Sequence, residues 1–223
     1  KLNVQLCKQD LLSSWESETM KAGANNRIAP EFNAFVMSYL ADSIAASTET
    51  NVWGGADAVG GQFEGFLTAS TGAFAADGTV NAVAKTATLD AGNIVENLTA
   101  LVDAIPATVL GKDDLVIFVN QKQYRFYISA MSALGYIDRH NMSADYSPVF
   151  EGMNLVVVDG LPADNMVAAR KSNLYFGCDL MGDSAQIKTL DMSDIDGSDN
   201  IRVICKYTAG TQIGIGSEIV HLS

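Results

Sequence analysis

Apolar residues recur along this chain with two periods, which predict both strands and helices. Residues 2–7 alternate Leu2, Val4 and Leu6 with other side chains, the pattern of a half-buried strand. Residues 30–53 place apolar side chains at steps of three and four, which predicts a long helix with one apolar stripe and Pro30 in its first turn. The stripe consists of Phe32, Phe35, Val36, Tyr39, Leu40 and Ile44.

The middle of the chain predicts a buried strand between two helices. The apolar run in residues 114–120 predicts a fully buried strand, and residues 121–135 follow as a helix that ends at Gly135. Before the strand, Asp90 is expected to cap a helix that Pro106 ends. The helix after the strand is expected to turn five side chains inward: Tyr124, Tyr127, Ile128, Met131 and Leu134.

Strand patterns return in the last third, where Gly, Asp and Pro turns divide successive β segments. A short helix is also expected from Asp10 to Met20. Because both chain ends carry half-buried strand patterns, we expect residues 2–7 to join a sheet with strands of the last third, around the helix 30–53. The predicted fold class is α+β.

Charge narrows the function classes. The 223 residues contain 14 Lys and Arg against 26 Asp and Glu, a formal net charge of -12. Such a surface repels nucleic-acid backbones and anionic membranes. Apolar runs such as residues 115–119 are far shorter than a membrane span. We therefore predict no membrane partner and no binding of nucleic acid, either sequence-specific or sequence-independent.

Three cysteines, Cys7, Cys178 and Cys205, are widely spaced and form no CxxC pair. This usage suits reduced thiols in a cytosol better than a disulfide framework. Burial is the default expectation for them, and Cys205 falls on one face of a predicted strand.

Glycines at 54, 55, 60, 61 and 65 follow the long helix and raise the question of a phosphate loop. Gly55 and Gly60 have the P-loop spacing, but Gly61 and Gln62 stand where Lys and Ser or Thr are required. A dinucleotide loop needs a strand before it, whereas this cluster follows a helix. We expect the glycines to let the chain leave the helix and reverse.

Other candidate sites are weak. His140 and His221 are far apart in sequence and are expected to be solvated or hydrogen-bonded side chains. Aspartates in residues 191–200 suggest calcium, but Gly197 and Cys205 occupy the wrong places for an EF-hand. We nominate no catalytic, cofactor-binding or metal-binding residue and no cofactor.

The order of these elements resembles one family, the major capsid proteins of tailed bacteriophages and prophages, with the Hong Kong 97 phage shell fold. Four features carry the resemblance: "NVWGGADAVGGQFEGFLT" after the long helix, Asn120 after the buried strand, Gly152 through Pro162, and Tyr175 through Leu180. The resemblance covers essentially all 223 residues.

The resemblance implies a peripheral domain of residues 1–89 and 181–223, with the long spine helix and a β-sheet. It implies an axial domain of residues 90–180, a sheet flanked by helices, with residues 136–150 near its tip. The N-terminal arm and extended loop of the family are expected upstream of Lys1, where no initiator Met stands.

The function implied is a structural, non-enzymatic subunit of an icosahedral or prolate head that self-assembles around the genome. Its partners would be copies of itself in pentamers and hexamers, with scaffold, maturation protease and portal. It would reside in the virion, after assembly in the cytoplasm of a bacterial host. Two alternatives stay open: an encapsulin-type nanocompartment shell, and a small α/β ligand-binding or enzyme domain.

Overall fold

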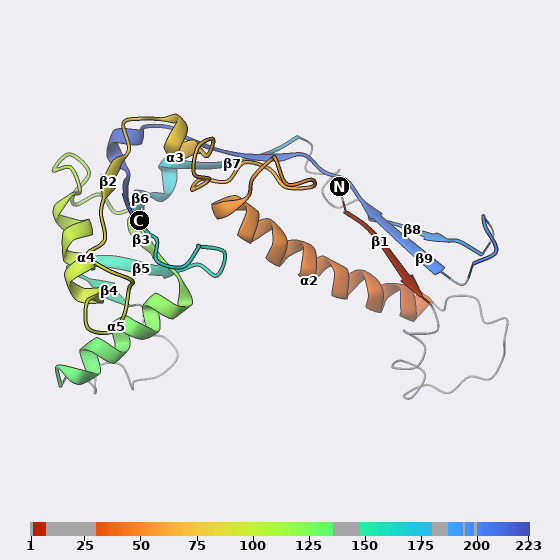
Figure 1. Cartoon of the computed structure of the whole chain (residues 1–223), viewed down its shortest axis with the longest axis horizontal. Coiled ribbons are helices and arrows are strands. Elements are labelled where there is room, and N and C mark those ends of the chain that lie inside the picture. Colours follow the sequence, from red (N-terminus) through yellow and green to blue (C-terminus); the bar gives the residue numbers. More distant parts are fainter. Residues whose placement is uncertain (1, 8–29, 136–147, 180–186, 194, 199) are drawn as a thin grey trace. The chain divides into compact units, whose positions relative to one another are not determined.

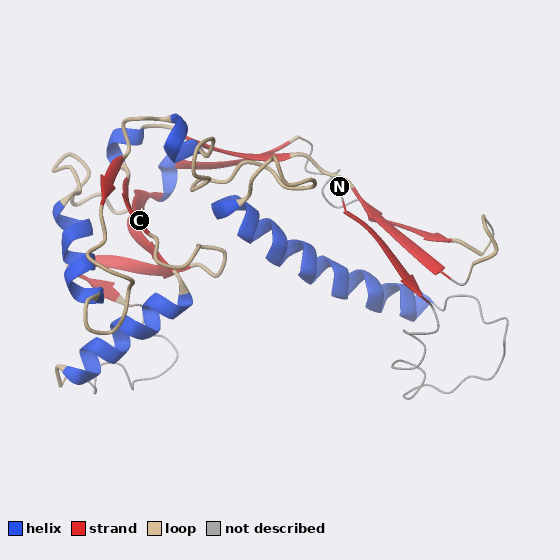
Figure 2. Ribbon diagram, viewed as in Figure 1, coloured by secondary structure: helices blue, strands red, loops and turns tan. Residues whose placement is uncertain are grey.

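The computed structural model describes residues 2–7, 30–135, 148–179, 187–193, 195–198 and 200–223. Helices and strands are mixed along the chain, which confirms the predicted α+β class (Figure 1, Figure 2). The chain divides into two compact units. The first unit contains residues 1–45 and 178–209, and the second unit contains residues 46–177 and 210–223.

A mixed six-stranded sheet organises the second unit, in the order β2-β11-β6-β3-β5-β4. Pairs β3–β5 and β11–β2 are parallel, and the other neighbours are antiparallel. The sheet therefore joins the end of the chain to its middle. Its strands are β2 (Asn81–Val83), β3 (Leu115–Val119), β4 (Val149–Phe150), β5 (Met153–Val157), β6 (Met166–Arg170) and β11 (Val220–Leu222).

Strand β3 is buried at all five positions, as its apolar run predicts. One face of the sheet contributes Leu115, Ile117 and Val119 to a core that includes α4 (Ile94–Asp103) and α5 (Gln121–Ala133). The other face contributes Val116 and Phe118 to a second core. Because both faces are covered, the strand reads as a continuous apolar run rather than an alternating one.

Helix α5 begins where the sequence predicts because Asn120 caps it. The Asn120 side chain accepts a hydrogen bond from the Lys122 N–H at 2.9 Å, and Gln123 Oε1 accepts from the Asn120 N–H at 2.8 Å. This reciprocal pair is a capping box. Gly135 follows the helix with φ 86°, a left-handed conformation that favours glycine.

Two local expectations are wrong. Leu134 is 64% exposed instead of inward, because it is the C-cap residue of α5 and leaves the helical stripe. Asp90 does not cap α4 directly: α4 begins at Ile94, and the Asp90 carboxylate accepts the N–H groups of Gly92 and Asn93 in the preceding turn.

The first unit contains a three-stranded antiparallel sheet in the order β1-β9-β8. Strand β1 (Leu2–Cys7) pairs with β9 (Asn200–Cys205), which confirms that the N-terminal strand joins strands of the last third. Strand β8 (Ile187–Asp191) completes the sheet. The cysteine expectation is wrong for Cys178, which is exposed, while Cys7 is half-buried.

Helix α2 (Pro30–Gly54) has 25 residues and confirms the predicted long helix. Leu40 on its predicted stripe is buried. A second predicted helix, Asp10 to Met20, lies outside the described residues, as do residues 136–147 of the predicted axial tip. Further elements are the short helix α3 (Ala73–Ala76), strands β7 (Leu174–Cys178) and β10 (Ala209–Ile213), which pair with each other, and the 3-10 turns η1 (Lys171–Asn173) and η2 (Gly216–Glu218).

The compact units do not have the boundaries of the predicted peripheral and axial domains. Residues 46–89 and 210–223 belong to the same unit as residues 90–177. Strands β2 and β11 explain this grouping, since they extend the sheet that contains β3. The terms peripheral and axial refer to positions in a shell, so that assignment stays a prediction.

Candidate functional site

The glycine-rich segment after α2 folds back along the last turn of that helix. The N–H groups of Gly65, Phe66 and Leu67 donate to the carbonyls of Gly55, Val52 and Trp53 at 2.8–2.9 Å. The returning chain thus satisfies carbonyls that a helix end leaves without partners.

Two of these glycines are required by close backbone approach. A Cβ at Gly55 would lie 2.4 Å from the Phe63 carbonyl oxygen, and one at Gly65 would lie 2.6 Å from the Asn51 carbonyl oxygen. At Gly60, by contrast, no atom lies within 4 Å of such a Cβ. The glycines therefore differ in role although they look alike in the sequence.

Side chains accept hydrogen bonds from further backbone N–H groups of this turn. Gln62 Oε1 accepts from the Ala56 N–H at 3.1 Å, and Glu64 Oε1 accepts from the Asp57 N–H at 3.2 Å. The Thr68 hydroxyl donates to the Gly55 carbonyl. A phosphate loop offers free N–H groups to its ligand, whereas these are bound internally. These internal hydrogen bonds give the turn a structural role, and the absence of nucleotide binding stays a prediction.

The aspartate-rich segment between β8 and β9 makes local turns. Asp191 Oδ1 accepts from the Ser193 hydroxyl at 2.7 Å, and Asp196 Oδ1 accepts from the Ser198 hydroxyl at 2.6 Å. Asp194 and Asp199 lie outside the described residues. Within the described part of the chain, no three His, Cys, Asp or Glu side chains are grouped so that they could hold a metal ion.

An ion pair joins the ends of two central strands. Arg170 Nε lies 3.0 Å from Asp114 Oδ1, and Arg170 also approaches Glu218 Oε2 at 3.4 Å. Hydrogen bonds from the Ser172 hydroxyl and from Arg170 lower the pKa of Asp114 to about 2. Because Leu115 and Arg170 are paired in the ladder, this cluster fixes the start of β3 against the end of β6.

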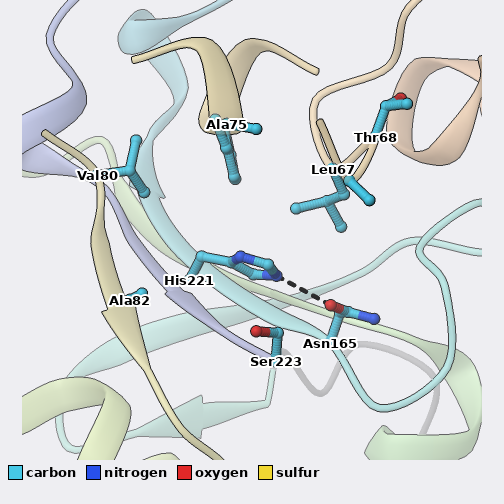
Figure 3. Close-up of a pocket in the computed structure, with 10 residues that line it drawn as sticks. Leu67, Thr68, Ala75, Val80, Ala82, Asn165, His221 and Ser223 are labelled. Atoms are coloured by element: carbon cyan, nitrogen blue, oxygen red, sulfur yellow. Dashed lines mark hydrogen bonds between the residues drawn. The ribbon is translucent and has the colours of Figure 1, made fainter. Parts of the chain in front are cut away.

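His221 lies on β11 at the wall of an open hollow of about 420 Å³ in the second unit (Figure 3). Its Nε2 lies 2.9 Å from Asn165 Oδ1, and the Phe74 ring packs edge-on against the imidazole at 5.8 Å. Burial lowers the pKa of His221 to about 4. The other candidate, His140, lies outside the described residues.

Large apolar side chains remain exposed at several places on the described surface. Tyr175 is 54% exposed and Phe176 is 49% exposed, and both belong to the narrow β7–β10 ribbon. The others are Val59, Leu110, Leu134, Val149, Leu190, Ile195 and Ile215. Sequence periodicity does not reveal these residues, because β7 carries aromatic side chains on both faces of a two-stranded sheet.

Among the helices that the structure describes, none combines the length and the apolar composition that a bilayer-spanning segment needs.

Comparisons with known proteins identify the fold through structure alone. No protein-family model and no curated protein matches the sequence. A chain of the satellite phage P4 procapsid matches with a TM-score of 0.57 and 10% identity, over 100% of this chain and 73% of its own. The capsid of an empty GTA particle matches with 0.55 and 14% identity, over 99% and 71%.

A third solved structure, the holo-SrpI encapsulin complex from Synechococcus elongatus, matches with a TM-score of 0.54 and 9% identity, over 100% of this chain and 71% of its own. The chain thus has the fold of phage capsid and encapsulin shells, as its resemblance predicts.

Proposed function

We propose that this chain is a structural subunit of a tailed-phage or prophage head, icosahedral or prolate. It assembles with copies of itself into the shell that encloses the genome. The observation that supports this function is the match of 99–100% of the chain to the P4 procapsid and the GTA capsid. Because these matches cover 99–100% of the chain, almost no residue lies outside the part that aligns with a capsid fold.

An encapsulin-type shell is the second candidate, and the SrpI complex is the observation that favours it. Its TM-score of 0.54 is close to the 0.57 and 0.55 of the phage-related structures. Both candidates are self-assembling shells, so they differ in what the particle contains rather than in how subunits associate. The P4, GTA and SrpI structures do not favour the third alternative, a small α/β ligand-binding or enzyme domain.

The exposed surface is consistent with repeated contacts between copies. Apolar side chains such as Tyr175 and Ile215 favour association, but scattered patches of this kind are small compared with a stable dimer interface. Weak contacts suffice in a closed array, because each subunit holds several neighbours through the same heterologous surfaces. A role of this kind requires no catalytic residue, and we propose that the protein is not an enzyme.

Within this function, residues 1–89 and 181–223 form the peripheral domain and residues 90–180 the axial domain. The copies associate in pentamers and hexamers, and scaffold, maturation protease and portal are further proposed partners. Assembly takes place in the cytoplasm of the bacterial host, and the mature protein resides in the virion.

Electron microscopy of the protein expressed from its complete gene, alone and with the neighbouring genes, tests this function. We expect closed particles of uniform diameter. Extraction of their contents separates the candidates: nucleic acid indicates a phage head, and a co-purifying protein cargo indicates an encapsulin. A product that stays monomeric at every protein and salt concentration, even with the neighbouring genes, would refute both.

A further inference from the structure

The hollow beside His221 has walls from five separate parts of the second unit, one of which is Asn165 between β5 and β6. Leu67 and Thr68 follow the glycine-rich turn, Ala75 lies on α3, Val80 precedes β2, and His221 lies on β11. Figure 3 shows these side chains around one space, with the imidazole reaching into it. Its volume of about 420 Å³ is within the range of small-molecule sites.

Hydrogen bonding determines which ring nitrogen of His221 carries the proton. The Asn165 amide nitrogen donates to the Ala163 carbonyl at 2.9 Å, which directs Oδ1 of the same amide toward His221. Since Oδ1 only accepts, the His221 Nε2 must carry the proton and donate. In the neutral ring Nδ1 is then an acceptor.

That acceptor has no hydrogen-bond partner among the described residues. The lining around it is mainly apolar, with Leu67, Phe74 and Val80 among its members. Water can bond this acceptor in the open hollow, so an apolar ligand that displaces the water loses that hydrogen bond unless it brings a donor of its own. The hollow therefore favours a ligand that brings one donor on an apolar body.

Charged ligands fit poorly. None of the ten described residues that line the hollow is Asp, Glu, Lys or Arg. An ion that left water for this space would lose hydration without gaining an opposite side-chain charge.

We infer that the hollow beside His221 is a binding site for a small neutral group that combines an apolar body with one O–H or N–H donor. Phenols and indoles have this chemistry as free molecules. Tyrosine and tryptophan side chains of a second copy have it as well, and the exposed Tyr175 is one such side chain. The site itself does not depend on the proposed shell function, and only the second source does.

Binding of p-cresol and of toluene, followed by NMR on the whole chain, tests the site. The two probes differ by the hydroxyl. We expect p-cresol to saturate with a Kd in the region of about 1 mM and to shift the signals of Leu67, Ala75 and His221. Toluene should bind roughly three- to tenfold more weakly, because it cannot donate to Nδ1.

Variants refine the test. The double variant His221→Phe, Asn165→Leu keeps an aromatic wall and removes both Nδ1 and the Asn165 oxygen that His221→Phe alone would leave unpaired, so p-cresol and toluene should then bind equally. Ala75→Phe should fill the hollow and abolish binding of both probes. Its matched control is Ala76→Phe, which changes the next exposed residue on α3 but not the lining. Absence of p-cresol binding to the wild-type chain, or equal binding of both probes to it, would overturn the inference without any variant.

The source of the natural group is decided by Tyr175→Phe. If a second copy supplies the group, this variant weakens self-association in sedimentation, and p-cresol competes with association of the wild type. If a free molecule supplies the group, neither Tyr175→Phe nor p-cresol changes self-association. Both results support the site, and neither bears on whether closed particles form, which microscopy tests separately.

Discussion

Replacement of Gly65 by alanine should destabilise the protein strongly, although only one methyl group is added. The new Cβ would lie 2.6 Å from the Asn51 carbonyl oxygen and 2.8 Å from Gly55 N. Real Cβ atoms essentially never approach heavy atoms within 3.0 Å. Both neighbours are backbone atoms, so the turn itself must move.

That movement costs free energy in two ways. Overpacking of a close-packed site costs roughly 1–3 kcal/mol. Displacement also breaks the hydrogen bonds of Gly65 and Phe66 to the carbonyls of Gly55 and Val52, each worth about 0.5–1.5 kcal/mol. The expected loss is about 2–6 kcal/mol, or a decrease in Tm of roughly 4–24 °C for a chain of this size.

Gly60→Ala is the matched control in the same turn. Gly60 is exposed, and no atom lies within 4 Å of an added Cβ. Its free energy of unfolding should stay within about 1 kcal/mol of the wild type. Urea unfolding of both variants, followed by fluorescence, measures the difference, since Trp53 is buried beside this turn at 5.5 Å from the Phe66 ring.

Two results would refute the reasoning. Equal stability of the two variants would show that close approach does not explain Gly65. Micromolar ATP or NAD binding that is lost in Gly60→Ala would show that the turn is a phosphate site after all, because only that hypothesis requires the exposed glycine.

Three further predictions concern the free energy of unfolding at acidic pH, the cap of helix α5 and assembly. The pKa of His221 is lowered from 6.5 to about 4, so the unfolded chain binds the proton first and stability should fall as pH decreases from about 6.5 to about 4. The loss is at most about 3 kcal/mol, and His221→Phe should remove it in urea titrations between pH 7 and 5. Asn120→Ala should lower the free energy of unfolding by about 2–3 kcal/mol, because Asn120 caps α5 and also donates to the Leu161 carbonyl at 2.7 Å. Gln121→Ala, at an exposed position, is its control and should cost less than about 0.5 kcal/mol in the same assay. Subunits of net charge -12 repel one another, and salt screens this repulsion. Light scattering should therefore show assembly at a lower protein concentration in about 0.5 M NaCl than in about 0.05 M NaCl. The opposite order would indicate that attraction between charges drives assembly.

Periodicity predicts the elements whose environment is uniform along their length. Strand β3 lies buried between two cores and is visible as an apolar run, and α5 is delimited by Asn120 and Gly135. Leu134 is mispredicted because the stripe continues in sequence after the helix has ended. The pairing of β1 with β9 follows from strand patterns at both ends, but its register depends on contacts far apart in sequence.

The candidate sites were less predictable because they depend on distant segments. Gly60 and Gly65 look alike in the local sequence, and the backbone atoms of Asn51, Trp53 and Gly55 around Gly65 distinguish them. His221 is expected from sequence to be solvated or hydrogen-bonded, and its partner Asn165 is indeed far away along the chain. No local signal shows that Leu67 and Ala75 form a hollow with it.

The turn after α2 and the hollow beside His221 share a wall, which leads to a final prediction. Leu67 is held by the hydrogen bond from its N–H to the Trp53 carbonyl, and Thr68 is held by its bond to Gly55. Displacement of the turn in Gly65→Ala should therefore weaken p-cresol binding, although Gly65 does not line the hollow. By linkage, p-cresol at ten times its Kd should raise the free energy of unfolding of the wild type by about 1.4 kcal/mol and that of Gly65→Ala by less. An equal increase in both would show that the two features are independent, because a ligand can stabilise only the structure that binds it.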